Sequence, residues 1–380
     1  MKPHIFLLPL WAALVSGATA DPPAPRLLGV VTIPTDAAPD GLPVGGVSGV
    51  DYDSSTGSWF LVSDDKSEYG PARFWIARIA LSPNGPPSVD LLQTIPMRRP
   101  DGATFPPAGT GAEASDSESI RKVPGKSQVI WSTEGDDRDG FGPALTLADM
   151  SGRFLGRITL PPMFDRDPVR RTGPRPNLSI EGVSFLGGGR DLWFSLEAPL
   201  FQDGPVASPE HGVLIRLTHL AFPSGRMIAQ YAYPVEPIGP VPPGRLADNG
   251  VSEILMLDDR HVLVIERSGV QQPNGDFAFR PRLYCASLNG ADDISGMTSL
   301  MGRAPRTARK RLVYDFTTVG QPRIDNVEGM TLGPRLPDGK RSLVFVTDND
   351  FSPRRASQVI ALELPTKGDN AAVARTLCPR

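Results

Sequence analysis

Carboxylates and hydroxyls recur at two fixed places in five copies of one pattern along this chain. Each copy opens on Ser or Glu, passes through a turn rich in Gly, Pro or Asp, and ends in an apolar stretch that runs into an acid, as in "SGVDYDSSTGSWFLVSDD" at 48–65. The opening residues are Ser48, Glu118, Glu181, Ser252 with Glu253, and Glu328. The closing residues are Asp64, Glu134, Glu197, Glu266 and Asp348. Equivalent positions of a repeat fold come together in space, so we expect these acids to converge.

Converging carboxylates are suited to binding a divalent cation. Crowded like charges raise one another's pKa and destabilise the fold unless something neutralises them. Calcium takes about six to eight oxygen ligands in irregular geometry, and further oxygen donors follow in "SDD" (63–65), "TEGDD" (133–137) and "TDND" (347–350). We predict calcium as the cofactor, with the ligands Asp64, Asp65, Glu118, Glu134, Glu197, Glu253, Glu266 and Asp348. The alternative is that most of these acids cap turns and tie neighbouring strands together.

The sequence lacks the motifs of the common hydrolase classes. The motifs of histidine acid phosphatases, Cys-x₅-Arg phosphatases, G-x-S-x-G hydrolases, H-E-x-x-H proteases and P-loop enzymes are absent. After residue 20 the chain contains three histidines, His211, His219 and His261, and one of them would suffice for a Ser-His-Asp triad. For a chain that acts as a hydrolase, attack by a metal-activated water is therefore the mechanism that these residues fit best.

Within that mechanism, we predict Glu181 and Glu328 as the catalytic residues. Arg171, Arg175 and Arg323 lie in loops that precede repeat starts, which is expected to place them at the same end of the fold as the acids. Arginine binds anionic oxygens in a bidentate manner, so these three are predicted to bind the substrate.

The elements that must position these residues are short strands. Successive copies begin about 63 to 75 residues apart, and after Glu118 four strand candidates fit inside one period, at 118–123, 128–133, 144–149 and 154–160. Four short antiparallel strands per period are typical of a propeller blade. The last copy is followed by one good strand candidate, 357–364, and the stretch 26–33 could supply the missing outer strand. We predict an all-β propeller of five or six four-stranded blades, closed by the N-terminal strand. A pair of β-sandwiches or an irregular all-β fold is the alternative.

The N-terminus indicates export. Lys2 and His4 precede an apolar run at 5–15 and the small residues 18–20, the order of a secretory signal peptide. The run is shorter than the ~20 residues that span a bilayer, although an uncleaved anchor is an alternative. We predict a signal peptide at 1–20, a single domain at 21–380, no membrane span, and a periplasmic or secreted protein.

The net charge and the two cysteines give further information about partners and cellular compartment. Without Lys2 the formal charge of −3 becomes −4, which argues against a nucleic-acid partner. Cys285 and Cys378 could form a disulfide in an oxidising compartment, and two separate buried thiols are the alternative.

Three stretches of the chain resemble a known family. They are "GGVSGVDYD…WFLVSDD" at 45–65, "SIEGVSF…LWFSLE" at 179–197 and "DNVEGMTL…LVFVTDND" at 325–350, and they resemble the phytase-like domain family, described as "esterase-like activity of phytase". The resemblance implies a secreted or periplasmic β-propeller that hydrolyses phosphate or carboxylic esters of a small anionic or ester substrate. Two alternatives stay open: a binding propeller in which calcium is only structural, and a lactonase-like metal-dependent propeller enzyme.

Overall fold

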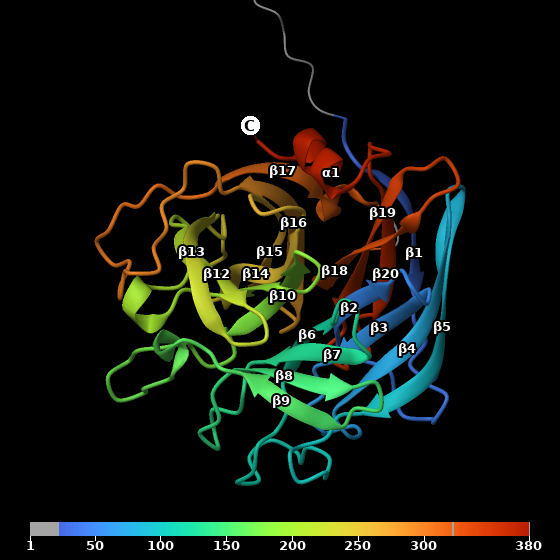
Figure 1. Cartoon of the computed structure of the whole chain (residues 1–380), viewed down its shortest axis with the longest axis horizontal. Helices are drawn as coiled ribbons and strands as arrows, with labels where there is room; N and C mark the ends of the chain where they lie inside the picture. The colour runs from blue at the N-terminus through green and yellow to red at the C-terminus, as the bar shows by residue number, and fades with distance from the viewer. Residues whose placement is uncertain (1–22, 321–322, 380) are drawn as a thin grey trace, which may run out of the picture.

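The fold is a ring of five antiparallel four-stranded sheets, the blades of a β-propeller (Figure 1). The computed structural model describes residues 23–320 and 323–379. The predicted signal peptide, 1–20, lies outside the described residues. In the described part of the chain there are five blades, so the five-bladed prediction is confirmed and a sixth blade is not formed. The sandwich alternative is excluded by the ring.

The blades follow one another in chain order. Blade 1 contains β2 (Val47–Asp53), β3 (Ser58–Ser63), β4 (Arg73–Ser82) and β5 (Gly85–Pro96). Blade 2 contains β6 (Ser117–Lys122), β7 (Gln128–Thr133), β8 (Ala144–Asp149) and β9 (Phe154–Ile158). Blade 3 contains β10 (Ile180–Leu186), β11 (Asp191–Leu196), β12 (Val213–Ala221) and β13 (Arg226–Val235). Blade 4 contains β14 (Ala247–Met256), β15 (His261–Gln271), β16 (Phe277–Ser287) and β17 (Arg309–Asp315). Blade 5 contains β18 (Asn326–Arg335), β19 (Arg341–Asp348), β20 (Gln358–Glu363) and, on its outer side, β1 (Arg26–Thr32).

The helical elements of the described chain are short. They are η1 (Pro162–Phe164), η2 (Phe201–Asp203), η3 (Phe316–Thr318) and α1 (Asn370–Leu377). Among the described helices, none is long and apolar enough to cross a membrane.

The first strand of each blade lines the central channel. β2, β6, β10, β14 and β18 lie nearest the centre in Figure 1, and each contacts the next around the ring, β18 returning to β2. The second strands, such as β3 and β11, are buried from their second residue onward because a blade packs on each face. The outer strands alternate between buried and exposed residues, as β4 and β5 do. In the sequence, the buried inner strands therefore appear as continuous apolar runs, and the outer strands as alternating apolar and polar residues.

Apolar side chains fill each interface between neighbouring blades. Trp59 and Val346 belong to the cluster between blades 1 and 5, and Phe194 and Ile130 to the cluster between blades 2 and 3. Similar clusters fill the other three interfaces. The core is therefore a ring of five clusters, which requires the ring to close.

The N-terminal strand closes the ring, as predicted. β1 pairs antiparallel with β20, from Arg26 opposite Glu363 to Thr32 opposite Gln358. The four strands predicted after Glu118 are also confirmed as β6 to β9, with β9 ending two residues earlier than expected.

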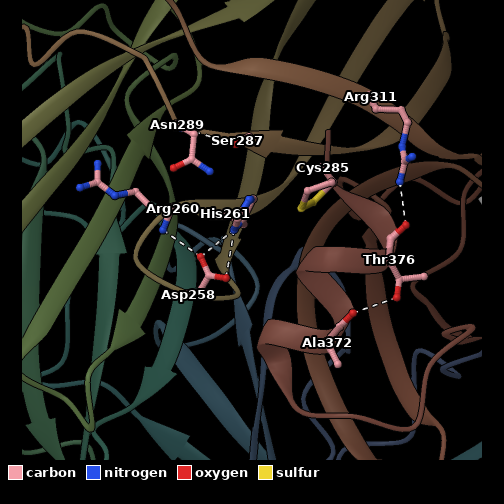
Figure 2. The surroundings of a disulfide bond; sticks show 10 residues. Asp258, Arg260, His261, Cys285, Ser287, Asn289, Arg311, Ala372 and Thr376 are labelled. Atoms are coloured by element: carbon pink, nitrogen blue, oxygen red, sulfur yellow. Dashed lines mark hydrogen bonds and ion pairs between the residues drawn. A yellow bond between two sulfur atoms is a disulfide. The ribbon is translucent and has the colours of Figure 1, made fainter. Parts of the chain in front are cut away.

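The C-terminal segment joins blades 4 and 5 covalently. Cys378 follows α1 and forms a disulfide with Cys285 of β16, so the predicted pairing is confirmed (Figure 2). Val373 and Leu377 of α1 pack into the cluster between these blades. Figure 2 also shows Arg311 of β17 donating a hydrogen bond of 2.9 Å to the Thr376 carbonyl. The last helix is therefore held to blade 4 by both a covalent bond and a polar contact.

Candidate functional site

A β-bulge at the start of each innermost strand presents the repeat-opening residues. The pairing register between first and second strands shifts at the same place in all five blades. The residues that fall in these shifts include Ser48, Glu118, Glu181, Ser252 and Glu328. A bulge leaves its extra residue unpaired and changes the direction of its side chain. The repeated Ser and Glu positions are therefore built into the backbone of the channel mouth.

Glycines next to the bulges bring adjacent inner strands close together. A Cβ at Gly182 would lie 2.5 Å from the Ile254 nitrogen of β14, and a Cβ at Gly329 would lie 2.9 Å from the Ser48 carbonyl of β2. A side chain at either position would push the blades apart. The Glu-Gly pairs of the sequence thus combine a channel-facing acid with the space that the neighbouring strand needs.

Eight carboxylates converge at this end of the channel, and we call them the mouth carboxylates. They are Asp64, Asp116, Glu118, Glu134, Glu181, Glu197, Glu328 and Asp348. All are buried except Asp64, which is partly exposed.

Two groups of three carboxylates share Glu134. One group is Asp116, Glu118 and Glu134, and the other is Glu134, Glu181 and Glu197; in each, one oxygen per residue lies within 4.8 Å of the others. Asp64, Asp348 and the exposed Asp350 form a third group of the same dimensions. A carboxylate has two oxygens, so Glu134 can serve two neighbouring cation positions at once.

Among the described residues, the cationic side chains that contact the mouth carboxylates are Lys66 and Arg267. Lys66 Nζ lies 2.6 Å from Asp116 Oδ2. Arg267 Nη2 lies 2.8 Å from Glu197 Oε1 and 3.6 Å from Glu328 Oε1. Since the eight mouth carboxylates have only these two cationic partners among the described residues, the buried mouth carries an excess of negative charge.

This excess shows in the pKa values of the acids. Burial first, and then neighbouring carboxylates, raise the pKa of Glu118, Glu134, Glu181 and Asp348 well above the usual range. Burial raises the pKa of Glu197 to about 7, even though Arg267 opposes the shift. The mouth must therefore hold protons or bind cations when the protein is at neutral pH.

The donor set fits a hard cation such as calcium. The mouth groups present carboxylate oxygens, which calcium prefers, whereas zinc sites use imidazole or thiolate ligands. Two further oxygens, Ser179 Oγ and Asn326 Oδ1, are buried without a hydrogen-bond partner among the described residues. Asn326 Nδ2 donates to Glu328 Oε1 at 2.7 Å and to Asp348 Oδ2 at 3.2 Å, so this side chain lies among the mouth carboxylates. The Ser179 backbone nitrogen donates to Glu134 Oε1.

The register of blade 4 moves Glu266 away from the mouth. Glu266 is opposite Val251, which places Arg267 where the other blades have their closing acids. Shifting one residue along a strand moves a side chain to the opposite face. Glu266 instead lies between blades 3 and 4, where it accepts a hydrogen bond of 2.7 Å from Tyr233 Oη and pairs with Lys310. Glu266, which was expected to be a metal ligand, therefore links blade 3 to blade 4 through its contacts with Tyr233 and Lys310.

Glu253 and Asp65 also lie apart from the mouth groups. Glu253 occupies the position after the bulge and forms an ion pair of 2.6 Å with Arg121 in the channel interior. Asp65 is buried against Arg73, also at 2.6 Å, and accepts backbone hydrogen bonds from Glu68 and Tyr69. The oxygens of both acids are therefore already occupied by side-chain and backbone donors.

Arg121 and Glu253 close the channel, and we call this pair the channel plug. Arg121 comes from blade 2 and donates to the carbonyls of Val50, Val183 and Ile254, which belong to blades 1, 3 and 4. Glu253 Oε1 accepts from the backbone nitrogens of Val183 and Ile254. One arginine therefore ties four blades at the axis.

The predicted substrate arginines have other contacts. Arg171 and Arg175 lie over the Phe201 ring, and Arg175 also donates to the carbonyls of Pro199 and Gly204. Arg323 is exposed and contacts Asp325 at 3.3 Å. Within the described chain, none of the three contacts a mouth carboxylate.

A different set of cations lies beside the mouth. A cavity of about 320 Å³ is lined by Lys66, Arg138 and Arg166 together with the mouth carboxylates Asp116 and Glu134. Arg166 forms an ion pair with Asp137 in its wall. This cavity offers positive charge next to the shared acid Glu134.

The sequence interpretation missed Asp116, Asn326 and Arg267. Asp116 and Asn326 both lie two residues before an opening Glu, and Ser179 has the same position before Glu181. Comparing the position two residues before the opening residue of each repeat would have found them. Arg267 could not be found this way, because it stands where an acid was expected.

The histidines lie at the blade edges in local contacts. His219 Nε2 is 2.9 Å from Asp191 Oδ1, and the His219 ring stacks on Trp193. His261 Nδ1 is 2.8 Å from Asp258 Oδ1, as Figure 2 shows. His211 contacts Ser208 in an exposed turn. None of these contacts joins a histidine to the mouth carboxylates.

A comparison with protein families finds a match over most of the chain. The family model "Phytase-like: Esterase-like activity of phytase" matches residues 42–351. A search of curated proteins finds no matching sequence.

Solved structures with a similar shape are distant in sequence. The catalytic domain of an α-L-arabinofuranosidase from Coprinopsis cinerea is 10% identical, with a TM-score of 0.40, and the match covers 90% of this chain and 97% of that one. A fructofuranosidase from Schwanniomyces occidentalis, complexed with fructose, is also 10% identical, with a TM-score of 0.38 and coverage of 87% and 60%. At this level of similarity the two structures say nothing about the activity of this chain.

Proposed function

The chain belongs to the phytase-like family, and from that membership and the acidic channel mouth we propose that it is a calcium-dependent hydrolase of phosphate or carboxylic esters. The observation that carries the proposal is the sharing of Glu134 between two buried carboxylate groups. Crowded buried carboxylates destabilise a fold, and groups of ionisable residues with shifted pKa values are typical of functional sites.

The two groups that share Glu134 are the proposed cation positions. Asp116, Glu118 and Glu134 would hold one cation, and Glu134, Glu181 and Glu197 would hold the other. Asp64 and Asp348 would contribute to a further position at the edge of the mouth. When bound, calcium would polarise an ester oxygen and lower the pKa of a water molecule. Asp65, Glu253 and Glu266 are not among the proposed ligands, because each lies outside the carboxylate groups and is paired there with Arg73, Arg121 or Lys310.

Residues of the chain would orient the water and the ester. Glu328 belongs to neither proposed cation group, and Asn326 and Arg267 hold its carboxylate beside Glu197. We propose Glu328 as the base that takes a proton from the attacking water, and Glu181, which is also a ligand in the second cation group, as the residue that orients that water. Lys66, Arg138 and Arg166 would bind the anionic oxygens of the substrate in the adjacent cavity.

The proposed site of action is outside the cytoplasm. A disulfide such as Cys285–Cys378 persists in oxidising compartments and is rare in the cytoplasm. Together with the predicted signal peptide at 1–20, it supports a periplasmic or secreted protein.

The test is ester hydrolysis by the purified protein without residues 1–20. Phosphate release from phytate and from phenyl phosphate, and acid release from phenyl acetate, would be measured with excess calcium and with EDTA. We expect calcium-dependent release from at least one substrate. Glu134→Gln is expected to lower that rate at least ~100-fold, in line with losses on removal of a group that stabilises the transition state. Glu210→Gln, at an exposed loop position, is the matched control.

Absence of hydrolysis in all conditions would contradict the proposal. The burial of seven mouth carboxylates would then favour the second candidate, a binding propeller in which enclosed calcium only stabilises the fold. Calcium would still raise the melting temperature in that case, because a ligand that binds only the folded state stabilises it.

A further inference from the structure

Two aromatic rings stack at the rim of the channel mouth. Tyr69 follows β3 of blade 1, and Phe351 follows β19 of blade 5. Their ring centroids are 4.2 Å apart with an angle of 9° between the planes. Tyr69 is 51% exposed, which is unusual for a large aromatic residue inside an otherwise ordered loop. The pair therefore offers a flat ring surface to solvent.

The ring pair lies directly against the mouth carboxylate Asp64. A Cβ added at Gly46 would lie 2.9 Å from Phe351 Cε2 and would also contact Asp64 Oδ1. A Cβ at Gly45 would lie 2.6 Å from Phe351 Cδ1. Only the bare backbone of these glycines separates the Phe351 ring from the acid, so one small molecule can reach both.

The Phe351 side of the pair is held by a strained turn. Asp350 and Phe351 have φ of 46° and 50°, two successive residues other than glycine in the left-handed region. Such a conformation costs energy and persists only where other contacts fix it. Asn349 Oδ1 accepts hydrogen bonds from the Gly46 and Phe351 nitrogens at 3.0 and 3.1 Å. Asp348 Oδ1 accepts from the Asp350 nitrogen at 2.7 Å.

The Tyr69 side is held by the buried ion pair of Asp65 and Arg73. Asp65 Oδ1 accepts hydrogen bonds from the Glu68 nitrogen at 2.8 Å and the Tyr69 nitrogen at 3.2 Å. Ser67 has a φ of 61°, and its hydroxyl donates to the Phe105 carbonyl at 2.9 Å. Both rings are therefore fixed in place before any ligand arrives.

We propose that Tyr69 and Phe351 form a subsite that binds the aryl ring of a substrate whose anionic end enters the channel mouth. An aromatic face stacks well on another flat ring, and a rigid platform loses little entropy on binding. The inference rests on the proposed function for the location of the reacting end. It adds that the substrate carries its ring on the blade 1 and blade 5 side of the mouth.

Direct binding tests the subsite independently of catalysis. Phenylphosphonate and methylphosphonate would be titrated into the protein with calcium by calorimetry, because neither can be hydrolysed. We expect phenylphosphonate to bind about 3- to 10-fold more tightly than methylphosphonate, as a stacking contact would give. Tyr69→Ala should abolish that difference, whereas Tyr69→Phe should keep it. Tyr52→Ala is the matched control, since Tyr52 contacts the Trp59 ring at a tilt of 40° and lines a cavity on the Arg121 side of the channel, away from the mouth.

The outcomes separate the subsite from the hydrolase proposal. Equal affinity for the two phosphonates, or a difference that survives Tyr69→Ala, would overturn the subsite. A ring preference that depends on Tyr69 in a protein without esterase or phosphatase activity would support the subsite and contradict the hydrolase.

Discussion

The mouth and the plug both lie along the innermost strands of the propeller but differ in how their charges are balanced. At the plug, Arg121 and Glu253 neutralise each other, and their donors and acceptors are paired with backbone groups of neighbouring blades. At the mouth, eight carboxylates face two cations, and buried oxygens of Ser179 and Asn326 have no partner among the described residues. The charges of the plug are paired within the chain, whereas the described residues leave an excess of negative charge at the mouth.

Burial of a glutamate does not by itself distinguish a structural residue from a candidate metal ligand. Glu253 and Glu134 are both buried glutamates of the channel, and burial raises the pKa of both. What differs is the second cause, which is Arg121 for Glu253 and the neighbouring Asp116 for Glu134. A buried acid with a dedicated cation is a structural tie, and a buried acid among other acids is a candidate ligand.

The largest expected effect follows from breaking the plug. Arg121→Met keeps much of the side-chain volume but leaves Glu253 buried without its cation and three carbonyls without their donor. Removing one partner of a buried pair costs about 3–5 kcal/mol. Urea unfolding followed by tryptophan fluorescence should show a loss of this size. A loss below about 1 kcal/mol would mean that the plug is not what holds the inner strands together.

The same substitution at the two ends should act in opposite directions. With EDTA at pH 8, Glu253→Gln is expected to lower the free energy of unfolding by about 1–3 kcal/mol, because Arg121 loses its counter-charge. Glu134→Gln removes one of several like charges, so it should raise stability or leave it unchanged. Melting temperatures of both variants and of Glu210→Gln measure the contrast. Equal destabilisation at both sites would remove the distinction between plug and mouth.

The third expected effect is the dependence of stability on pH. Burial raises the pKa of Glu197 to about 7, above its value in the unfolded chain. An acid whose pKa is raised by folding stabilises the folded state below its unfolded pKa, and that contribution is lost as pH rises through the folded pKa. With EDTA, the free energy of unfolding should therefore fall by about 1–3 kcal/mol between pH 5 and pH 8.

Calcium provides the control for this pH dependence. A cation at the mouth would neutralise the ionised acids, so added calcium should stabilise the protein more at pH 8 than at pH 5. The Glu134→Gln variant should show a smaller fall with pH and a smaller response to calcium. A pH profile that is flat in EDTA would indicate that the mouth acids are already compensated within the chain.

Much of the fold could be predicted from the sequence. Strand lengths, turns and the number of repeats are local properties, and the need for an outer strand in blade 5 follows from counting. The disulfide between Cys285 and Cys378 could only be offered as one of two alternatives, since a pairing depends on distances between segments 93 residues apart.

The sequence by itself determined that acids would gather at one end of a five-bladed ring, because the pattern repeats in every blade. Only the tertiary structure decided which acids they are. In blade 4 the register puts Ser252 in the bulge, sends Glu253 to Arg121, and places Arg267 where Glu266 was expected. The physical reason is that side chains alternate along a strand, so one residue of register moves a charge between the mouth, the plug and a blade interface.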